Sequence, residues 1–496
     1  MKKQAFNPYL PLDTYIPDGE PHVFGDRVYI YGSHDREGGS NFCELDYECW
    51  SAPVTDLSDW RCEGTIYRAK QCPHYCKERQ DLYAPDVVQG NDGRYYLYYD
   101  LSGRGDHGFD GPISVAVCDT PAGQYEYYGD VRYSDGRPFL RYIPFDPAVL
   151  NDNGRIYLSY GWGFVMDTNM PLIKPVMPYV MRKIFNKSVQ EIKSEEPLSV
   201  MGANVVELEG DMLTVKGEPK RILPAINNAP RGTEYRKHCF YEGASLRKFG
   251  DLYYFIYSSQ VNHELCYATS KYPNKDFTYR GVIISNGDVG INGRKEKDRL
   301  CATGTNHGSI EYINGQYFIF YHRLTHNTAF SRQGCAEPIK IEPDGTIKQV
   351  EMTSCGLNGG PLQAHGTYPA AICCNLTNGK MPHLKNVGKN RYAPNINHEK
   401  NVRFIKDIEN DTLIGYKYFD FQGETKVSVR YRGSGGKLSV MTMPGSPLDS
   451  VALNPSDHWT ESDMLTFEAN GKLPLNFIYT GKGKIDISEI LFKEGE

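Results

Sequence analysis

The sequence lacks three features that would place it in a large functional class. No apolar run in its 496 residues approaches the ~20 residues that a membrane-spanning helix needs. It has no excess of positive charge, because 55 Lys and Arg stand against 61 Asp and Glu. The net charge of -6 excludes the basic surface that nucleic-acid binding requires. Helical periodicity is also scarce. We therefore expect a globular protein with no nucleic-acid partner and no membrane partner.

The amino terminus lacks the apolar stretch of a secretory signal, because Pro8 and Pro11 interrupt it. The 13 cysteines are an odd number, which is typical of reduced thiols. A cluster of potential zinc ligands lacks the paired C-x-x-C spacing of a structural site. Its members are Cys62, Cys72, His74 and Cys76. We expect a cytoplasmic protein, although a signal peptide removed from this chain would leave the same pattern.

The aromatic content indicates the fold class. The chain has 37 Tyr and 21 Phe, together with 49 Gly and 30 Pro. Tyr and Phe favour half-buried strands, whereas Gly and Pro interrupt them at turns. The composition therefore predicts an all-β protein, and the length predicts a large domain followed by a smaller one.

One short pattern recurs five times along the chain: a strand, a turn with Gly, and an aromatic strand that ends in Tyr. It occupies residues 22–31, 87–99, 148–160, 245–257 and 309–321. In each repeat Gly supplies the positive φ of a tight hairpin turn. Hairpins spaced so widely suit four-stranded blades with loop insertions, so we predict a five-bladed β-propeller over residues 1–350. The alternative is an irregular two-sheet protein.

An ionisable residue precedes the turn of each hairpin at the matching place. Each has a simpler interpretation, since Asp before Gly or Pro is usually a turn former. In a propeller, however, equivalent positions of successive blades converge around one channel. Clustered carboxylates repel one another and are costly to bury, so their recurrence indicates a functional pocket. The five residues are Asp18, Asp86, Asp146, Glu242 and His307.

Carboxylates with opposed protonation states in one pocket are what glycoside hydrolysis requires. The segments around these residues resemble, in order, the blade motifs of glycoside hydrolase family 43 across about residues 5–345. They are Asn7-Pro8 with Asp18, Tyr83-Ala84-Pro85-Asp86, Phe145-Asp146-Pro147, Glu242-Gly243-Ala244-Ser245 and His307-Gly308-Ser309.

The resemblance implies an inverting mechanism on a five-bladed propeller. Asp18 would be the general base and Glu242 the general acid. Asp146 would be a third carboxylate that raises the pKa of Glu242 and orients it. His307 would lie at the channel floor and hold a calcium ion or a water near the sugar, and it could equally be an ordinary hydrogen-bonded histidine. No cofactor is otherwise required.

Further residues are candidates for sugar binding. Asp86 is either structural or a ligand of a sugar hydroxyl. Trp162 and Phe42 could stack on a sugar face, although such aromatics more often fill a core. Arg323 could bind sugar hydroxyls, with a salt bridge as the alternative. The sequence departs from the family pattern at Gly19, where Pro usually follows the base, and at Tyr83, where Trp is common.

The composition and periodicity of the sequence change after the fifth hairpin. Residues 351–367 are rich in Gly and predict a connector. Residues 368–496 alternate with period two in runs near 412–419, 425–432, 437–441, 465–467 and 485–487, which predicts a β-sandwich. The pattern resembles the jelly-roll domains of carbohydrate-binding module family 6. The domain either binds glycan or buttresses the propeller.

The resemblance implies an exo-acting α-L-arabinofuranosidase that trims plant-derived oligosaccharides, with β-D-xylosidase or galactofuranosidase as alternatives. The insertion between the third and fourth hairpins, with Met166, Met170 and Met177, could cap the pocket. Two further interpretations remain open: a propeller that binds glycan without hydrolysing it, and an enzyme that transfers glycosyl groups to phosphate. The sequence does not reveal the oligomeric state.

Overall fold

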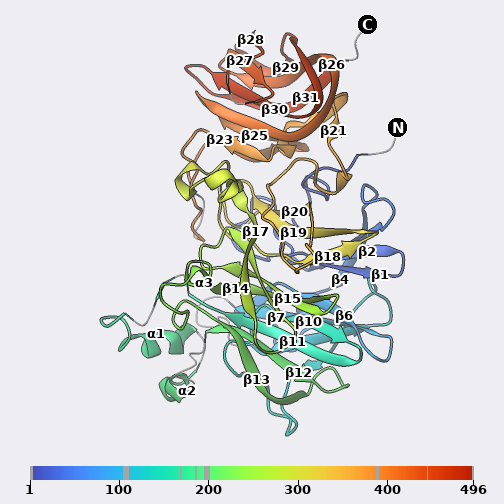
Figure 1. Ribbon diagram of the computed structural model, residues 1–496, viewed down its shortest axis with the longest axis vertical. Coiled ribbons are helices and arrows are strands. Elements are labelled where there is room, and N and C mark those ends of the chain that lie inside the picture. The colour runs from blue at the N-terminus through green and yellow to red at the C-terminus, as the bar shows by residue number, and fades with distance from the viewer. Residues whose placement is uncertain are drawn as a thin grey trace.

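The computed structural model describes residues 4–103, 111–164, 166–167, 170–184, 187–194, 201–386, 390–443 and 445–493. Strands dominate this part of the chain and form six sheets. No helix within the described residues has both the length and the apolar character needed to cross a membrane. Figure 1 shows the sheets in two bodies, a propeller below and a single curled sheet above it. The all-β prediction is confirmed.

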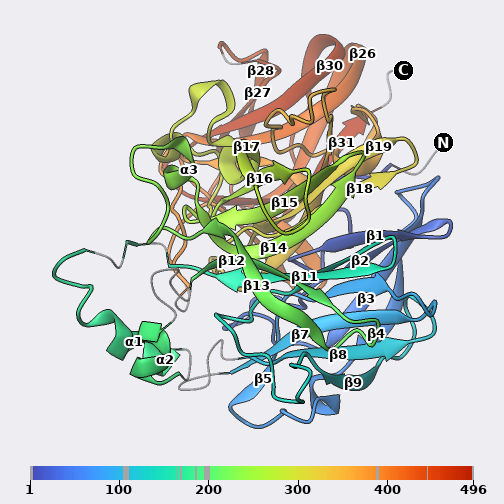
Figure 2. The ribbon, with the colours of Figure 1, turned by 60° about the horizontal axis from the view of Figure 1, so that its bottom comes forward.

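Five of the sheets are the blades of a β-propeller, as predicted, and Figure 2 shows them in a view turned towards the lower end. The first blade contains β1 (Glu20–Phe24), β2 (Arg27–Tyr31), β3 (Tyr47–Pro53) and β4 (Arg61–Tyr67). The second contains β5 (Arg79–Leu82), β6 (Asp86–Gln89), β7 (Tyr95–Gly103), β8 (Ile113–Cys118) and β9 (Glu126–Asp130). The third contains β10 (Ala148–Asp152), β11 (Arg155–Trp162), β12 (Gly202–Leu208) and β13 (Val215–Pro224). The fourth contains β14 (Phe240–Phe249), β15 (Leu252–Ser259), β16 (Glu264–Ser270) and β17 (Thr278–Ser285). The fifth contains β18 (Ile310–Ile313), β19 (Gln316–Leu324) and β20 (Arg332–Ile339).

Each of the five predicted hairpins forms two neighbouring antiparallel strands of a blade. Gly93 and Gly315 turn two of these hairpins with φ of 84° and 94°, a conformation that only glycine adopts readily. Buried side chains fill the space between neighbouring blades. Tyr98 of the second blade and Leu158 of the third, for example, belong to one cluster and are fully buried. Each such side chain contributes roughly 1.5–3 kcal/mol to stability.

The fifth blade differs from the predicted four strands, because its sheet has three. The amino-terminal segment lies along its open edge instead. Tyr9 N donates to Gly334 O at 3.2 Å, and Ala336 N donates to the Asn7 side chain at 3.0 Å. Residues 7–9 thereby join the fifth blade and close the ring, which explains why Asn7 is buried.

The helices lie outside the blades. Helices α1 (Met177–Ile184) and α2 (Val189–Ser194) belong to the insertion of the third blade and stand out from its side (Figures 1 and 2). Helix α3 (Glu234–Lys237) precedes β14. Short 3-10 turns complete the set: η1 (Ala69–Gln71), η2 (Asn286–Asp288), η3 (Ile291–Gly293), η4 (Glu296–Asp298), η5 (Gly356–Asn358) and η6 (Ala370–Ile372).

The sixth sheet is the carboxy-terminal domain and has eleven strands that curl around one core. Its strands are β21 (Leu362–Gln363), β22 (Gly366–Pro369), β23 (Asn375–Thr377), β24 (Asn395–Glu399), β25 (Val402–Ile408), β26 (Thr412–Gly433), β27 (Gly436–Met441), β28 (Asp449–Leu453), β29 (Ser456–Glu461), β30 (Leu465–Thr480) and β31 (Ile485–Lys493).

Two details of this domain differ from the sequence prediction. The runs 412–419 and 425–432 form one strand, β26, because Gly423 pairs with Ala469 of β30 within a continuous ladder and does not turn the chain. The segment 351–367 is also more than a connector. Leu362 already pairs with β26, and Gly366 pairs with β31, so these residues belong to the carboxy-terminal sheet.

Candidate active site

Five blades contribute to one pocket of about 300 Å³ at an end of the propeller channel. Four of its polar residues lie where the chain enters the first hairpin of a blade. Asp18 lies just before β1, Asp146 before β10 and His307 before β18, and Glu242 is near the start of β14. The full lining is Asp18, Phe42, Tyr83, Phe145, Asp146, Trp162, Tyr241, Glu242, Thr305, His307, Arg332 and Asn386.

Asp18 is buried in a cationic environment. Arg332 donates from Nη1 to its Oδ1 at 2.7 Å, and the Nδ1 atoms of His322 and His307 lie 3.3 and 3.8 Å from that oxygen. Burial raises the pKa of Asp18, but the Arg332 charge and the two histidines outweigh it and hold the pKa well below its usual range. Asp18 is therefore ionised at neutral pH, as a general base must be.

The pKa of Glu242 is shifted in the opposite direction. Burial raises its pKa to about 8, and the ionised Asp18 contributes to the same shift. Arg332 and a hydrogen bond with Trp162 oppose the shift without cancelling it. A carboxyl group with such a pKa keeps its proton at neutral pH and can donate it. The two carboxyls come from the first and fourth blades, which are not neighbours in the ring.

Asp146 connects the third blade to the acid. It adopts a positive φ of 48°, and its backbone N donates to Asp100 Oδ2 at 2.9 Å. Its Oδ2 accepts a hydrogen bond from Gly243 N at 3.0 Å, the residue after Glu242. Burial and the proximity of Glu242 raise the pKa of Asp146 well above its usual range. The contact with Gly243 suits the predicted orienting role, whereas the ionised neighbour that disfavours the Glu242 anion is Asp18.

Aromatic side chains form the walls of the pocket. Trp162 packs against Tyr241 with ring centroids 5.8 Å apart, and Tyr83 packs against Phe145 at 5.6 Å. Phe42 lies beneath the Arg332 guanidinium, 4.8 Å from it. Such faces suit the apolar side of a sugar ring. The predicted aromatics Trp162 and Phe42 therefore both lie in the pocket.

The structure places two predicted sugar ligands elsewhere. Arg323 is buried and donates to the carbonyls of Ala371 and Cys373 at 2.7 and 2.9 Å, facing the carboxy-terminal domain. Successive side chains of a strand point to opposite faces, and on β19 it is His322 that faces Asp18. The cation of the pocket is Arg332, which sequence reasoning missed. Its signal was a lone Arg in the small-residue run 331–336.

Asp86 also lies outside the pocket, deeper in the channel. It has no exposed surface, its Oδ1 lies 2.6 Å from His22 Nε2, and its Oδ2 accepts from Val149 N at 2.7 Å. It therefore ties the first three blades together and has no route to a sugar hydroxyl. Of the two roles that the sequence left open for Asp86, these contacts favour the structural one.

The insertion of the third blade does not supply a cap within the described residues. Met166 and Met170 are about half exposed and are absent from the pocket lining. Met177 packs instead in the cluster that supports Trp162 and Tyr241 from behind. Asn386, from the connection between β23 and β24 of the carboxy-terminal sheet, lines the pocket from outside the blades.

The surroundings of His307 offer few ligands for calcium, which prefers six to eight oxygen atoms. Its Nδ1 lies 3.8 Å from Asp18 Oδ1, and that oxygen already accepts from the Arg332 guanidinium. Burial lowers the pKa of His307 to about 4, so its ring is neutral. A calcium ion here remains a prediction that these contacts do not support, and no step below uses one.

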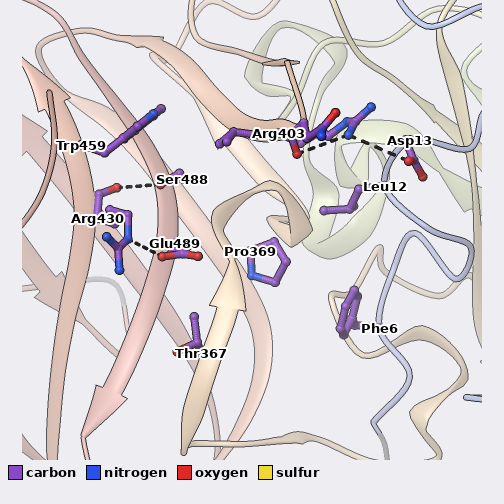
Figure 3. A pocket seen from close by; sticks show the side chains of 12 residues that line it. Phe6, Leu12, Asp13, Thr367, Pro369, Arg403, Arg430, Trp459, Ser488 and Glu489 are labelled. Carbon is purple, nitrogen blue, oxygen red and sulfur yellow. Dashed lines mark hydrogen bonds and ion pairs between the residues drawn. The ribbon is translucent and has the colours of Figure 1, made fainter. Parts of the chain in front are cut away.

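A larger cavity of about 790 Å³ lies against the carboxy-terminal sheet (Figure 3). Its two carboxylates each face a guanidinium: Glu489 accepts from Arg430 at 2.5 Å, and Asp13 lies 3.9 Å from Arg403. This arrangement provides no protonated acid opposite a base. The smaller pocket is therefore the site with the chemistry of hydrolysis.

Comparisons with known proteins show which family the chain resembles. Residues 7–196 match the family described as Glycosyl hydrolases family 43. A "Xylosidase/arabinosidase" of Thermoclostridium stercorarium is 45% identical over 98% of this chain and 98% of its own length. A "Xylosidase/arabinosidase 43A" of Humicola insolens is 28% identical over 68% of this chain and 98% of its own.

A solved structure shares the fold. It is a family 43 β-xylosidase/α-arabinofuranosidase from a compost metagenome, in complex with xylotriose and in a calcium-free form. It is 25% identical, covers 68% of this chain and 95% of its own, and superposes with a TM-score of 0.51. The likeness of the carboxy-terminal domain to carbohydrate-binding module family 6 stays a prediction. Because the relative from T. stercorarium matches almost the whole chain, this protein belongs to glycosyl hydrolases family 43 and is a glycoside hydrolase.

Proposed function

We propose that the enzyme is an inverting, exo-acting α-L-arabinofuranosidase that acts on plant-derived oligosaccharides without a cofactor. The observation that carries the mechanism is the opposed protonation of Asp18 and Glu242 in one pocket. β-D-Xylosidase activity is the second candidate, because the relatives named above carry both activities in their names.

Each proton has a defined path in this mechanism. Asp18 accepts a proton from a water molecule, whose oxygen attacks the anomeric carbon. Glu242 donates its proton to the glycosidic oxygen as the bond to the leaving group breaks. The products are the released sugar, with inverted configuration, and the shortened oligosaccharide. Arg332 keeps Asp18 ionised, and Asp146 holds the backbone that carries Glu242.

The size of the pocket supports exo action. Its volume of about 300 Å³ is at the small end of the ~300–1,000 Å³ typical of ligand pockets, which suits a terminal sugar unit. Transfer to phosphate is disfavoured, because Arg332 already uses its donors on carboxylates. Two of its nitrogens bind Asp35 and a third binds Asp18.

Hydrolysis of a panel of 4-nitrophenyl glycosides tests the sugar. We expect the α-L-arabinofuranoside to be cleaved with the highest kcat/KM, and the β-D-xyloside to follow. Higher kcat/KM on the xyloside would reverse the two candidates. Asp18→Asn and Glu242→Gln are the matched variants, because each removes one ionisable group while conserving shape. Turnover that persists in both variants would contradict the proposed site.

The two variants should differ in their response to the leaving group. 4-Nitrophenolate leaves without protonation, so Glu242→Gln should retain much more activity on the aryl glycoside than on an oligosaccharide. Asp18→Asn should lose roughly 10²–10⁴-fold on both. Equal losses for both variants on both substrates would contradict the assignment of acid and base.

A further inference from the structure

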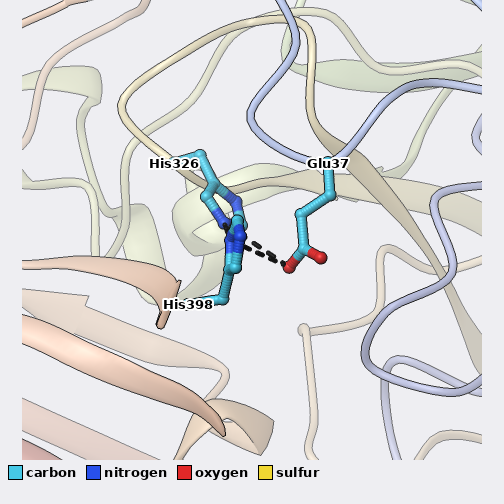
Figure 4. Close-up of side chains that lie close together, drawn as sticks. All are labelled: Glu37, His326 and His398. Atoms are coloured by element: carbon cyan, nitrogen blue, oxygen red, sulfur yellow. Dashed lines mark hydrogen bonds and ion pairs between the residues drawn. The ribbon is translucent and has the colours of Figure 1, made fainter. Parts of the chain in front are cut away.

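Three segments that are distant in the sequence meet where the propeller joins the carboxy-terminal sheet. Glu37 lies in the loop between β2 and β3 of the first blade. His326 lies in the turn between β19 and β20 of the fifth blade, and His398 lies in β24. Figure 4 shows the three side chains pointing at one another. We propose that Glu37, His326 and His398 bind a divalent transition-metal ion, zinc by ligand preference, that fastens this joint.

The distances between the ligand atoms suit such an ion. His326 Nε2 lies 2.8 Å from His398 Nδ1, and Glu37 Oε1 lies 3.6 and 3.2 Å from these two nitrogens. Ligands about 2.05 Å from a tetrahedral zinc ion stand about 3.3 Å from one another, and the three distances bracket that value. A water molecule would occupy the fourth position. Two imidazoles and one carboxylate are ligands that zinc prefers.

The hydrogen bonds around His326 indicate which of its ring nitrogens carries the proton. The hydroxyl of Thr325 donates to Ser331 O at 2.9 Å, so its oxygen accepts at 2.7 Å from His326 Nδ1. Nδ1 of His326 therefore carries the proton, and Nε2 presents its lone pair to His398 and Glu37. In the absence of metal a proton on His398 Nδ1 satisfies this contact. An ion takes the place of that proton, with His398 in its Nε2–H tautomer.

Neighbouring groups hold the carboxylate in place. The hydroxyl of Tyr15 donates to Glu37 Oε1 at 3.0 Å, and Arg403 donates to Oε2 at 2.6 Å and to Oε1 at 3.2 Å. These contacts fix the direction of the carboxylate, as supporting residues do in metal sites. Arg403 also places a positive charge beside the site, which lowers the affinity for a cation and predicts binding weaker than in a Cys-rich zinc site.

Two other groupings of candidate ligands in the described part of the chain are less suitable. Glu20, His22 and Asp86 surround the channel, but the Arg247 guanidinium bonds to Glu20 and lies 4.0 Å from Asp86, so a cation is already present. In the group of His238, Glu264 and Cys266, burial raises the pKa of the Cys266 thiol well above its ordinary value, which disfavours the thiolate that a metal needs.

The proposed ion would act on segments that lead to the catalytic pocket. Gly38, next to Glu37, donates to Ser331 Oγ at 2.7 Å, and Arg332 follows Ser331. Arg332 also bonds to Asp35, two residues before Glu37. The backbone N of His326 donates to Ile396 O of β24 at 2.8 Å. An ion at this place would thus hold the first blade, the fifth blade and the carboxy-terminal sheet together.

Metal titration of the whole protein tests the proposal. After dialysis against EDTA and then metal-free buffer, we expect the protein to bind one Co²⁺ per chain with the strong visible absorption of a tetrahedral site. Zn²⁺ should abolish that absorption by displacement. Zn²⁺ at about 100 times its Kd should also raise the Tm by about 2–3 °C.

His398→Ala and His398→Gln are the test variants, because this side chain is 34% exposed and its loss should not prevent folding. Both should lose the Co²⁺ absorption and the response of Tm to Zn²⁺. His458→Ala is the control, because it removes an exposed histidine from β29. It should retain both the Co²⁺ absorption and the response of Tm to Zn²⁺. Absence of the tetrahedral absorption in the unaltered protein, or an equal response in the His398 variants, would overturn the proposal.

Discussion

Arg332 and Asp18 form a buried ion pair, in which Nη1 of the guanidinium donates to Oδ1 of the carboxylate at 2.7 Å. The remaining donors of Arg332 bind Asp35 at 2.8 and 2.9 Å and so fix the guanidinium in place. The pair keeps the base ionised. The ionised base in turn helps Glu242 to keep its proton. Arg332 therefore keeps the base ionised, whereas burial and the ionised Asp18 keep the acid protonated.

Arg332→Gln should shift the acidic limb of the activity profile. Loss of the guanidinium removes the charge that holds the pKa of Asp18 down, so that pKa should rise towards its usual range. Because the base must be ionised, the limb of kcat/KM on the acidic side should move to higher pH. Arg323→Gln is the control, since Arg323 faces the carboxy-terminal domain. An acidic limb that shifts equally in Arg332→Gln and Arg323→Gln would contradict the role of Arg332 in lowering the pKa of Asp18.

The alkaline limb should report Glu242. The acid must be protonated and its pKa is about 8, so kcat/KM on an oligosaccharide should fall as the pH rises through about 8. In Glu242→Gln the residual activity on the 4-nitrophenyl glycoside should lose this limb. A pH profile of the two proteins on both substrates makes the comparison. An alkaline limb unchanged in Glu242→Gln would show that another group is responsible.

Asp146 should act on Glu242 through the backbone and not through charge. The ionised neighbour that raises the pKa of Glu242 is Asp18, and the pKa of Asp146 is itself raised well above its usual range. Asp146→Asn can still accept from Gly243 N, so its alkaline limb should stay near that of the unaltered protein. Asp146→Ala should lower kcat, because the hydrogen bond to Gly243 is lost. If both variants only raise KM, Asp146 binds substrate instead of positioning the acid.

Arg323→Ala should destabilise the protein without changing its pH profile. The guanidinium donates to two buried carbonyls, those of Ala371 and Cys373, and each would be left without this donor. At about 1–3 kcal/mol for each unsatisfied group, the free energy of unfolding should fall by about 2–6 kcal/mol. Thermal unfolding measures the loss. A stable variant with an altered kcat/KM would instead support the original prediction that Arg323 contacts the sugar.

The repeating hairpins predicted both the propeller and the place of its catalytic residues. Asp18, Asp146 and Glu242 were found because their register in three blades brings them to one end of the channel. Register did not show which way each side chain turns. Asp86 shares the register but bonds to His22 inside the channel. The sequence pattern also did not show which face of β19 each side chain occupies. Successive side chains of this strand point to opposite faces, so His322 faces Asp18 and Arg323 faces away from it.

Contacts between distant segments were beyond the sequence pattern. Arg332 meets Asp18 across 314 positions of the chain, and no local motif connects them. The pairing of residues 7–9 with β20 likewise depends on closure of the ring. In the carboxy-terminal sheet, the sequence pattern predicted separate strands near 412–419 and 425–432. The ladder between β26 and β30 instead continues through Gly423.

The most direct measurement follows the configuration of the first sugar released. Proton NMR of a fast reaction on an α-L-arabinofuranosyl oligosaccharide detects the anomer that forms before mutarotation. With Asp18 activating water and Glu242 donating a proton, the account predicts that the β-anomer appears first and then equilibrates. Initial release of the α-anomer would mean retention of configuration and would contradict the roles of Asp18 and Glu242.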